Sequence, residues 1–114
     1  MPYLLIRTNC TPDSATQAAL IRHLSGRLAN WLGKPEQYVM VAIQPGSAMI
    51  FAGSDAPCAY LELKSIGLPE AQLPDLSALL GRAMADELGI STDRVYIEFS
   101  ASEPQWWGWN CSTF

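Results

Sequence analysis

The chain has 114 residues, of which 49% are apolar and 16% are charged, and its formal net charge is −4. Soluble domains average about 25% charged residues, so this chain has too few to cover its surface. We expect apolar surface to be buried against a partner, most simply another copy of the chain. Seven dispersed basic residues exclude a nucleic-acid-binding stripe, and no apolar run is long enough to span a membrane.

The first half of the chain predicts a strand, a helix and a second strand. Tyr3–Thr8 is a compact apolar run that is typical of a buried strand. Thr11 is the predicted N-cap of the helix, with Pro12 at its first position. Apolar residues then recur at intervals of three and four until Gly33, which ends the helix. The second strand is predicted at Val39–Ile43.

The second half repeats this order. A strand is predicted at Cys58–Leu63, and a helix begins somewhere between Pro69 and Asp75 and ends at Gly89. Another strand follows at Val95–Phe99. Up to the glycine that ends each helix, the two halves have nearly the same length, which indicates an internal repeat.

Two β-α-β units predict an α/β (α+β) fold with one four-stranded mixed sheet. Because each crossover is right-handed, both helices fall on one face of the sheet, and the other face needs cover from a partner. The units span roughly residues 2–45 and 58–101, and a tail follows at 102–114. The length fits a single domain over residues 1–114.

Three features of the sequence are candidates for chemistry. If Met1 is removed, Pro2 carries a secondary amine whose burial would make it a neutral base near pH 7, although a proline can also simply follow the start codon. Lys34 stabilises a helix end or binds a substrate carboxylate. Three tryptophans within residues 106–109 form a packed tail, a subunit contact or the wall of an aromatic pocket.

Cofactor and metal chemistry have no support in the sequence. His23 is the only histidine and has no triad or zinc-site spacing around it. The glycines are dispersed, so no phosphate-binding loop is formed. Three cysteines at irregular spacing predict reduced thiols. We therefore expect neither a cofactor nor a metal.

An ordered set of short segments resembles the tautomerase superfamily, specifically its macrophage migration inhibitory factor group. No single segment is diagnostic, but the ordered set covers the whole chain. The matching segments are Met1-Pro2, Thr8-Asn9, Leu32-Gly33-Lys34-Pro35, Gln37-Tyr38-Val39, Phe51-Ala52-Gly53-Ser54, Pro57-Cys58-Ala59, Ser65-Ile66-Gly67, residues 90–97 and residues 108–114.

The resemblance implies a homotrimer, with three sheets around a central channel and an active site between two subunits. It also implies cofactor-free keto–enol tautomerisation of phenylpyruvate-like aromatic α-keto acids, in which Pro2 is the general base and acid. Lys34 and the backbone at Ile66 would hold the substrate carboxylate or oxygen. The residues that would line the aromatic pocket are Tyr38, Tyr96, Trp107, Trp109 and Phe114.

Departures from the family pattern leave other functions open. Glu98 stands where the animal proteins have Asn, and its charge is expected to alter substrate preference and raise the pKa of the Pro2 amine. One alternative is a cytokine-like interaction protein with a vestigial pocket, and another is a ferredoxin-like regulatory module. The absence of a signal peptide predicts a cytoplasmic protein, while the resemblance implies that export without one is also open.

Overall fold

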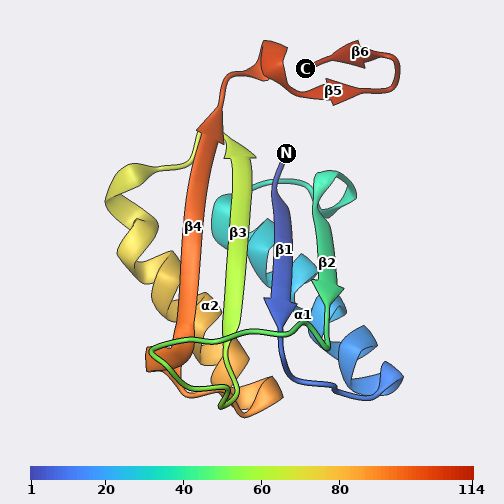
Figure 1. The fold of residues 1–114 in the computed structure, drawn as a ribbon. Helices are drawn as coiled ribbons and strands as arrows, with labels where there is room; N and C mark the ends of the chain where they lie inside the picture. The colour runs from blue at the N-terminus through green and yellow to red at the C-terminus, as the bar shows by residue number, and fades with distance from the viewer.

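The computed structural model describes residues 1–114 and contains a four-stranded mixed sheet with two helices behind it (Figure 1). The strand order is β2-β1-β3-β4. The β1/β2 and β3/β4 pairs are parallel, and β1/β3 is antiparallel. The predicted fold class is therefore confirmed. The elements are β1 (Tyr3–Thr8), α1 (Ser14–Leu32), β2 (Met40–Gln44), β3 (Ala59–Ile66), α2 (Leu73–Leu88) and β4 (Val95–Ser102).

The core lies between the sheet and the helices, because alternate residues of the two central strands point to the helical side. Leu4 of β1 pairs with Leu63 of β3, and Ile6 pairs with Leu61, and all four side chains are fully buried. Neither helix combines the length and the apolarity that a membrane span requires. The core cluster consists of Leu4, Ile6, Leu20, Leu24, Leu28, Ala59, Leu61, Leu63, Leu76, Leu80, Ala83, Met84 and Ile90.

The N-cap of α1 is Asp13, so the prediction of Thr11 was wrong. The Asp13 carboxylate accepts a hydrogen bond of 2.7 Å from the backbone N–H of Thr16. Pro12 therefore precedes the cap and is not the first helical residue, and its carbonyl oxygen accepts a hydrogen bond from the Gln17 side chain. The predicted helix end is confirmed, since Gly33 adopts a left-handed conformation with φ of 64°.

Strands β3 and β4 are longer than their apolar runs predicted. Both continue past Leu63 and Phe99, because the parallel ladder extends through the pairs Lys64–Ser100 and Ile66–Ser102. Polar residues can occupy these positions on the face without helices, where they meet solvent. The extension carries the sheet toward the end at which β1 begins.

The tryptophan-rich tail forms a small hairpin beyond that end of the sheet, near the amino terminus (Figure 1). Its strands are β5 (Gly108–Trp109) and β6 (Ser112–Thr113). Asn110 and Cys111 make the turn with φ of 51° and 63°. The Phe114 N–H donates to the Trp107 carbonyl oxygen at 3.1 Å, which holds the last residue against the start of the hairpin.

The segment between β2 and β3 crosses the opposite end of the sheet and is held there by Arg94 (Figure 1). The Arg94 guanidinium lies 5.3 Å from the centre of the Phe51 ring. Its four hydrogen bonds to this segment end on the carbonyl oxygens of Phe51, Ser54, Ala56 and Pro57.

Candidate functional site

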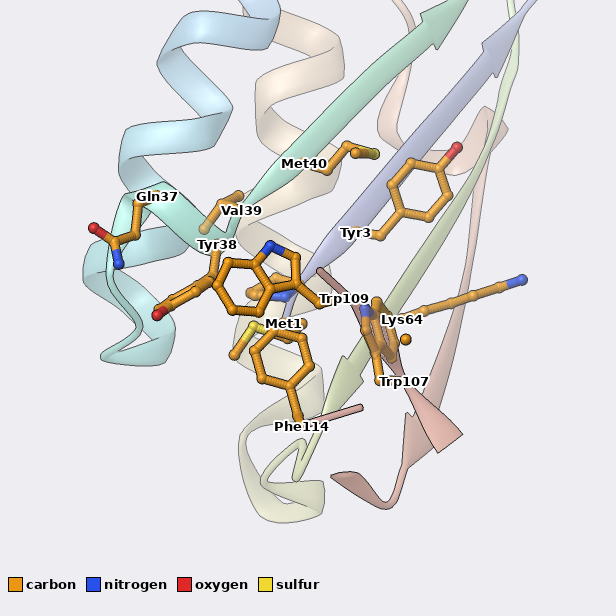
Figure 2. A pocket seen from close by; sticks show the side chains of 12 residues that line it. Met1, Tyr3, Gln37, Tyr38, Val39, Met40, Lys64, Trp107, Trp109 and Phe114 are labelled. Carbon is orange, nitrogen blue, oxygen red and sulfur yellow. The ribbon is translucent and has the colours of Figure 1, made fainter. Parts of the chain in front are cut away.

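A pocket of about 470 Å³ lies where the amino terminus, the start of β2 and the tail meet (Figure 2). Its walls come from Met1 to Tyr3, from residues 37–40 and from the hairpin, and Lys64 of β3 also lines it. The lining is mostly apolar or aromatic and includes no aspartate or glutamate. A mostly apolar pocket with few polar groups is typical of a small-molecule site.

The amino terminus is held firmly in this pocket. Pro2 is buried, and its carbonyl oxygen accepts a hydrogen bond of 2.9 Å from the N–H of Met40. Burial lowers the pKa of the Met1 amine, and the nearby Lys34 ammonium lowers it further. This environment favours the neutral form of an amine, which is the form that accepts a proton. With Met1 in place, however, the Pro2 nitrogen is an amide without a basic lone pair.

Three aromatic rings from distant parts of the chain form one side of the pocket (Figure 2). Tyr38, in the short 3₁₀ turn before β2, lies 5.8 Å from both Trp109 and Phe114 in edge-to-face arrangements. Trp109 and Phe114 are stacked at 5.5 Å. Trp107 also lines the pocket. The tail is therefore the wall of a pocket, as well as a packed terminus.

Lys34 and Ile66 meet close to this pocket. Gly33 ends α1 and turns the chain, so that Lys34 Nζ donates to the Ile66 carbonyl oxygen at 3.4 Å. Ile66 is the last residue of β3, at the end of the sheet where β1 begins. Neither ion pair of the chain involves Lys34, so its charge is available to an anion.

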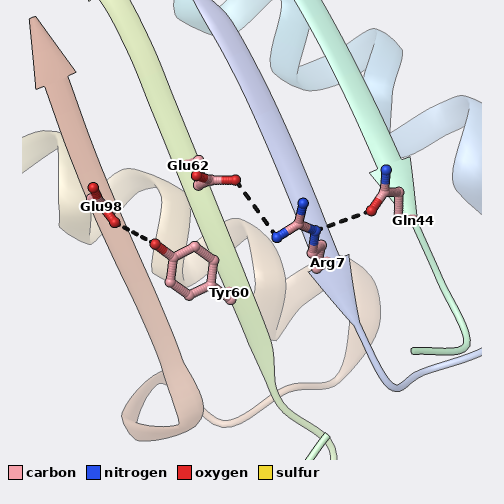
Figure 3. A network of polar contacts seen from close by, with 5 residues as sticks. All are labelled: Arg7, Gln44, Tyr60, Glu62 and Glu98. Atoms are coloured by element: carbon pink, nitrogen blue, oxygen red, sulfur yellow. Dashed lines mark hydrogen bonds and ion pairs between the residues drawn. The ribbon is translucent and has the colours of Figure 1, made fainter. Parts of the chain in front are cut away.

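In a single copy of the chain, two predicted site residues, Tyr96 and Glu98, do not line the pocket. Tyr96 is 64% exposed and packs on Phe51 with ring centres 4.5 Å apart. Together with Tyr60 it lines a separate hollow of about 350 Å³. Glu98 accepts a hydrogen bond from the Tyr60 hydroxyl on the face of the sheet without helices (Figure 3). That these two residues reach a pocket between subunits stays a prediction.

Several pocket residues were not predicted from the sequence. Tyr3, Gln37, Met40 and Lys64 line the pocket, but none belongs to a motif that marks it as functional. The antiparallel register places Lys64 opposite Tyr3 and so brings it to the amino terminus. This pairing could have identified Lys64, but the register is not visible in local periodicity.

The remaining polar side chains offer no candidate metal site. No three His, Cys, Asp or Glu side chains are arranged to hold a metal ion. His23 lies on the exposed side of α1, and its Nδ1 contacts a carboxylate oxygen of Glu87 on α2 at 2.6 Å. This contact joins the two helices far from the pocket residues.

Comparison with known proteins agrees with this geometry. The family model described as macrophage migration inhibitory factor (MIF) matches residues 1–114. The chain belongs to this family. It is 42% identical to the macrophage migration inhibitory factor homolog of Brugia malayi, over 100% of this chain and 99% of that protein. It is 39% identical to the Mus musculus factor over the same shares of the two chains.

Solved structures of the family have the same fold. The macrophage migration inhibitory factor homologue from Prochlorococcus marinus is 41% identical to this chain, with a TM-score of 0.93 and coverage of 98% of both chains. The factor from Trichinella spiralis is 32% identical, with a TM-score of 0.90 over 98% of this chain and 99% of that chain. The resemblance identified from short segments is thereby confirmed at the level of the family.

Proposed function

We propose that this protein is a cofactor-free keto–enol tautomerase of phenylpyruvate-like α-keto acids, in which Pro2 acts after Met1 has been removed. The observation that carries the proposal is the burial of the amino terminus in an aromatic pocket beside Lys34. Removal of Met1 would leave a secondary amine at the pocket wall. The same burial that lowers the pKa of the Met1 amine would favour a neutral proline amine.

In the proposed reaction, the Pro2 nitrogen takes a proton from the carbon next to the substrate carbonyl. The resulting ammonium returns the proton elsewhere on the enol framework, so no net oxidation occurs and no cofactor is consumed. Lys34 and the backbone at Ile66 would bind the substrate carboxylate, and the rings of Tyr38 and Trp109 would hold its aromatic ring. Such positioned acid–base catalysis typically contributes about 10² to 10⁴ in rate.

We also propose that the chain assembles as a homotrimer and that a neighbouring copy completes the pocket. The pocket of one chain is open, and Tyr96 and Glu98 lie on a separate exposed surface. In a trimer that joins these surfaces, both residues of one copy would face the Pro2 pocket of the next. The carboxylate of Glu98 would then influence which substrates are accepted.

The Pro2→Gly variant tests the proposed function. In protein whose intact mass shows that Met1 is absent, the substitution should abolish phenylpyruvate enol–keto turnover, because it removes the proline amine from the buried site. Pro12→Gly is the matched control, since Pro12 lies in the segment before α1, away from the pocket, and should leave turnover intact. Equal turnover in Pro2→Gly and the parent protein would eliminate the proline mechanism.

An extracellular interaction protein is the second candidate, on two observations. Trp106 is 80% exposed on the tail, and related proteins are named for inhibition of macrophage migration. This candidate requires export of a protein that we otherwise expect in the cytoplasm. It is favoured if Pro2→Gly leaves a receptor-dependent cell response unchanged while a Trp106→Ala variant loses it.

A further inference from the structure

Lys64 is the one positively charged side chain among the residues that line the pocket. The chain has two lysines, Lys34 and Lys64, and both lie at the end of the sheet where the amino terminus is buried. Lys64 lines the pocket opposite Tyr3, and its ammonium extends away from the rings of Trp109 and Phe114 (Figure 2). No acidic side chain lines the pocket, although the chain as a whole has a net charge of −4.

The carboxylates on the same face of the sheet already have partners. Glu62 lies two residues before Lys64 on β3 and pairs with Arg7 at 3.9 Å (Figure 3). Its neighbour across the ladder, Glu98, accepts the Tyr60 hydroxyl hydrogen bond. The two carboxylates are thus held away from the pocket end of β3, and neither ion pair of the chain uses Lys64.

We propose that Lys64 is a specificity-determining residue that selects α-keto acids carrying a second carboxylate. This inference rests on the proposed function, in which Lys34 binds the first carboxylate. A negatively charged protein repels a dianion overall, so the Lys64 ammonium at the pocket, with the Lys34 ammonium near the amino terminus, provides the local attraction that binding requires. Contacts between an ammonium and a carboxylate are stronger than neutral hydrogen bonds.

The inference predicts a preference that can be measured as a ratio. The substrates are phenylpyruvate and its 3-carboxy and 4-carboxy derivatives, and the readout is kcat/KM of the better derivative divided by kcat/KM of phenylpyruvate. Lys64→Met should lower this ratio about tenfold, as expected for one charge-assisted contact. Lys64→Arg should restore it, and added salt should reduce it in the parent protein. Arg82→Met, on the exposed surface of α2, is the control and should leave the ratio unchanged.

A binding measurement separates this inference from the proposed function. Quenching of tryptophan fluorescence reports the affinities for phenylacetate and for 3-carboxy- and 4-carboxyphenylacetate, none of which needs to react. Tighter binding of a dicarboxylate that Lys64→Met abolishes supports the inference, even if Pro2→Gly shows that the tautomerase mechanism is absent. The same ratio of affinities in Lys64→Met and the parent protein overturns it, whatever the turnover.

Discussion

At the scale of single residues, the one acidic residue that we propose to reach the substrate, Glu98, is hydrogen-bonded to a tyrosine. The Tyr60 hydroxyl donates to the Glu98 carboxylate on the adjacent strand, two residues along from Tyr96, which pairs with Tyr60 in the register. This hydrogen bond raises the pKa of Tyr60 above its usual value of 10.0, with smaller contributions from desolvation and from the charges of Glu98 and Glu62. The Glu98 carboxylate therefore already accepts a hydrogen bond from a neutral donor.

The Tyr60→Phe variant tests this hydrogen bond. The pKa of Tyr60 is higher in the folded than in the unfolded protein, so the hydrogen bond stabilises the fold while the pH is below the pKa that Tyr60 has in the unfolded chain. This stabilisation is lost as the pH rises through the pKa that Tyr60 has in the folded protein. The parent protein should therefore lose more stability above pH 10 than Tyr60→Phe does. In an ultraviolet titration, Glu98→Gln should lower the pKa of Tyr60 toward its usual value, since the accepting carboxylate charge is gone. If the Tyr60→Phe variant still contains a tyrosine with a raised pKa, the raised pKa does not belong to Tyr60.

At the scale of elements, the C-terminal end of α1 positions Lys34. Asp13 starts the helix through its hydrogen bond to Thr16, and Gly33 ends it in a left-handed turn that directs Lys34 toward Ile66. The aromatic wall depends in the same way on a turn, because the positive φ angles at residues 110 and 111 reverse the tail. The turns thus position Lys34 and the aromatic rings, while the strand register positions Lys64.

The Asp13→Ala variant tests the cap of α1. The hydrogen bond to the Thr16 backbone lowers the pKa of Asp13 below 3.8, so the stabilisation is present above that pH and is lost as the pH falls through the folded pKa. Asp13→Ala should lower the Tm by a few degrees at pH 7, and the difference from the parent should shrink toward pH 2. Asp13→Asn keeps a capping oxygen without a charge, so its smaller Tm difference should change little over this pH range. A constant Tm difference for Asp13→Ala would show that the charge does not matter.

At the scale of the whole molecule, a single copy is unusually open. Its radius of gyration is 14.3 Å, whereas a compact chain of this length has about 13 Å, because the hairpin projects beyond the sheet. Only 20 of 114 residues are buried. Large apolar side chains remain exposed at the sheet edge and in the loop, with Met40 at 64% and Ile50 at 72%. Such surfaces are typical of contact sites between proteins, which agrees with the low share of charged residues and with the proposed trimer.

The proposed trimer can be measured directly. Light scattering should give about 37 kDa, three times the chain mass of 12.5 kDa. Ile50→Glu should shift the protein toward the monomer, because a charge would have to be buried between copies. Asp86→Lys changes a charge on the exposed surface of α2, on the helical side of the sheet, and should leave the mass unchanged. A mass near 12.5 kDa for the parent protein would contradict the proposed trimer.

The elements of the fold were largely predictable, whereas their ends were less so. Apolar periodicity and the two helix-ending glycines located both helices and all four main strands. The cap of α1 was misplaced by two residues, since Thr11 and Asp13 both fit the preference for capping residues and only the hydrogen bond to Thr16 distinguishes them. The boundaries of the repeats and the roles of the site residues stay predictions.

The sequence by itself determined the fold class, the family and the identity of Pro2 and Lys34 as candidate site residues. Only the tertiary structure brought Tyr38 against the hairpin rings and placed Lys64 in the pocket. It also brought the Tyr60 hydroxyl within hydrogen-bond distance of Glu98. Helix and strand periodicity is local, so it can be seen in a few consecutive residues. The antiparallel register of β1 with β3 joins residues about 60 positions apart, and it is fixed by packing of the whole core. The position of Lys64 in the pocket, beside the amino terminus, follows from that register.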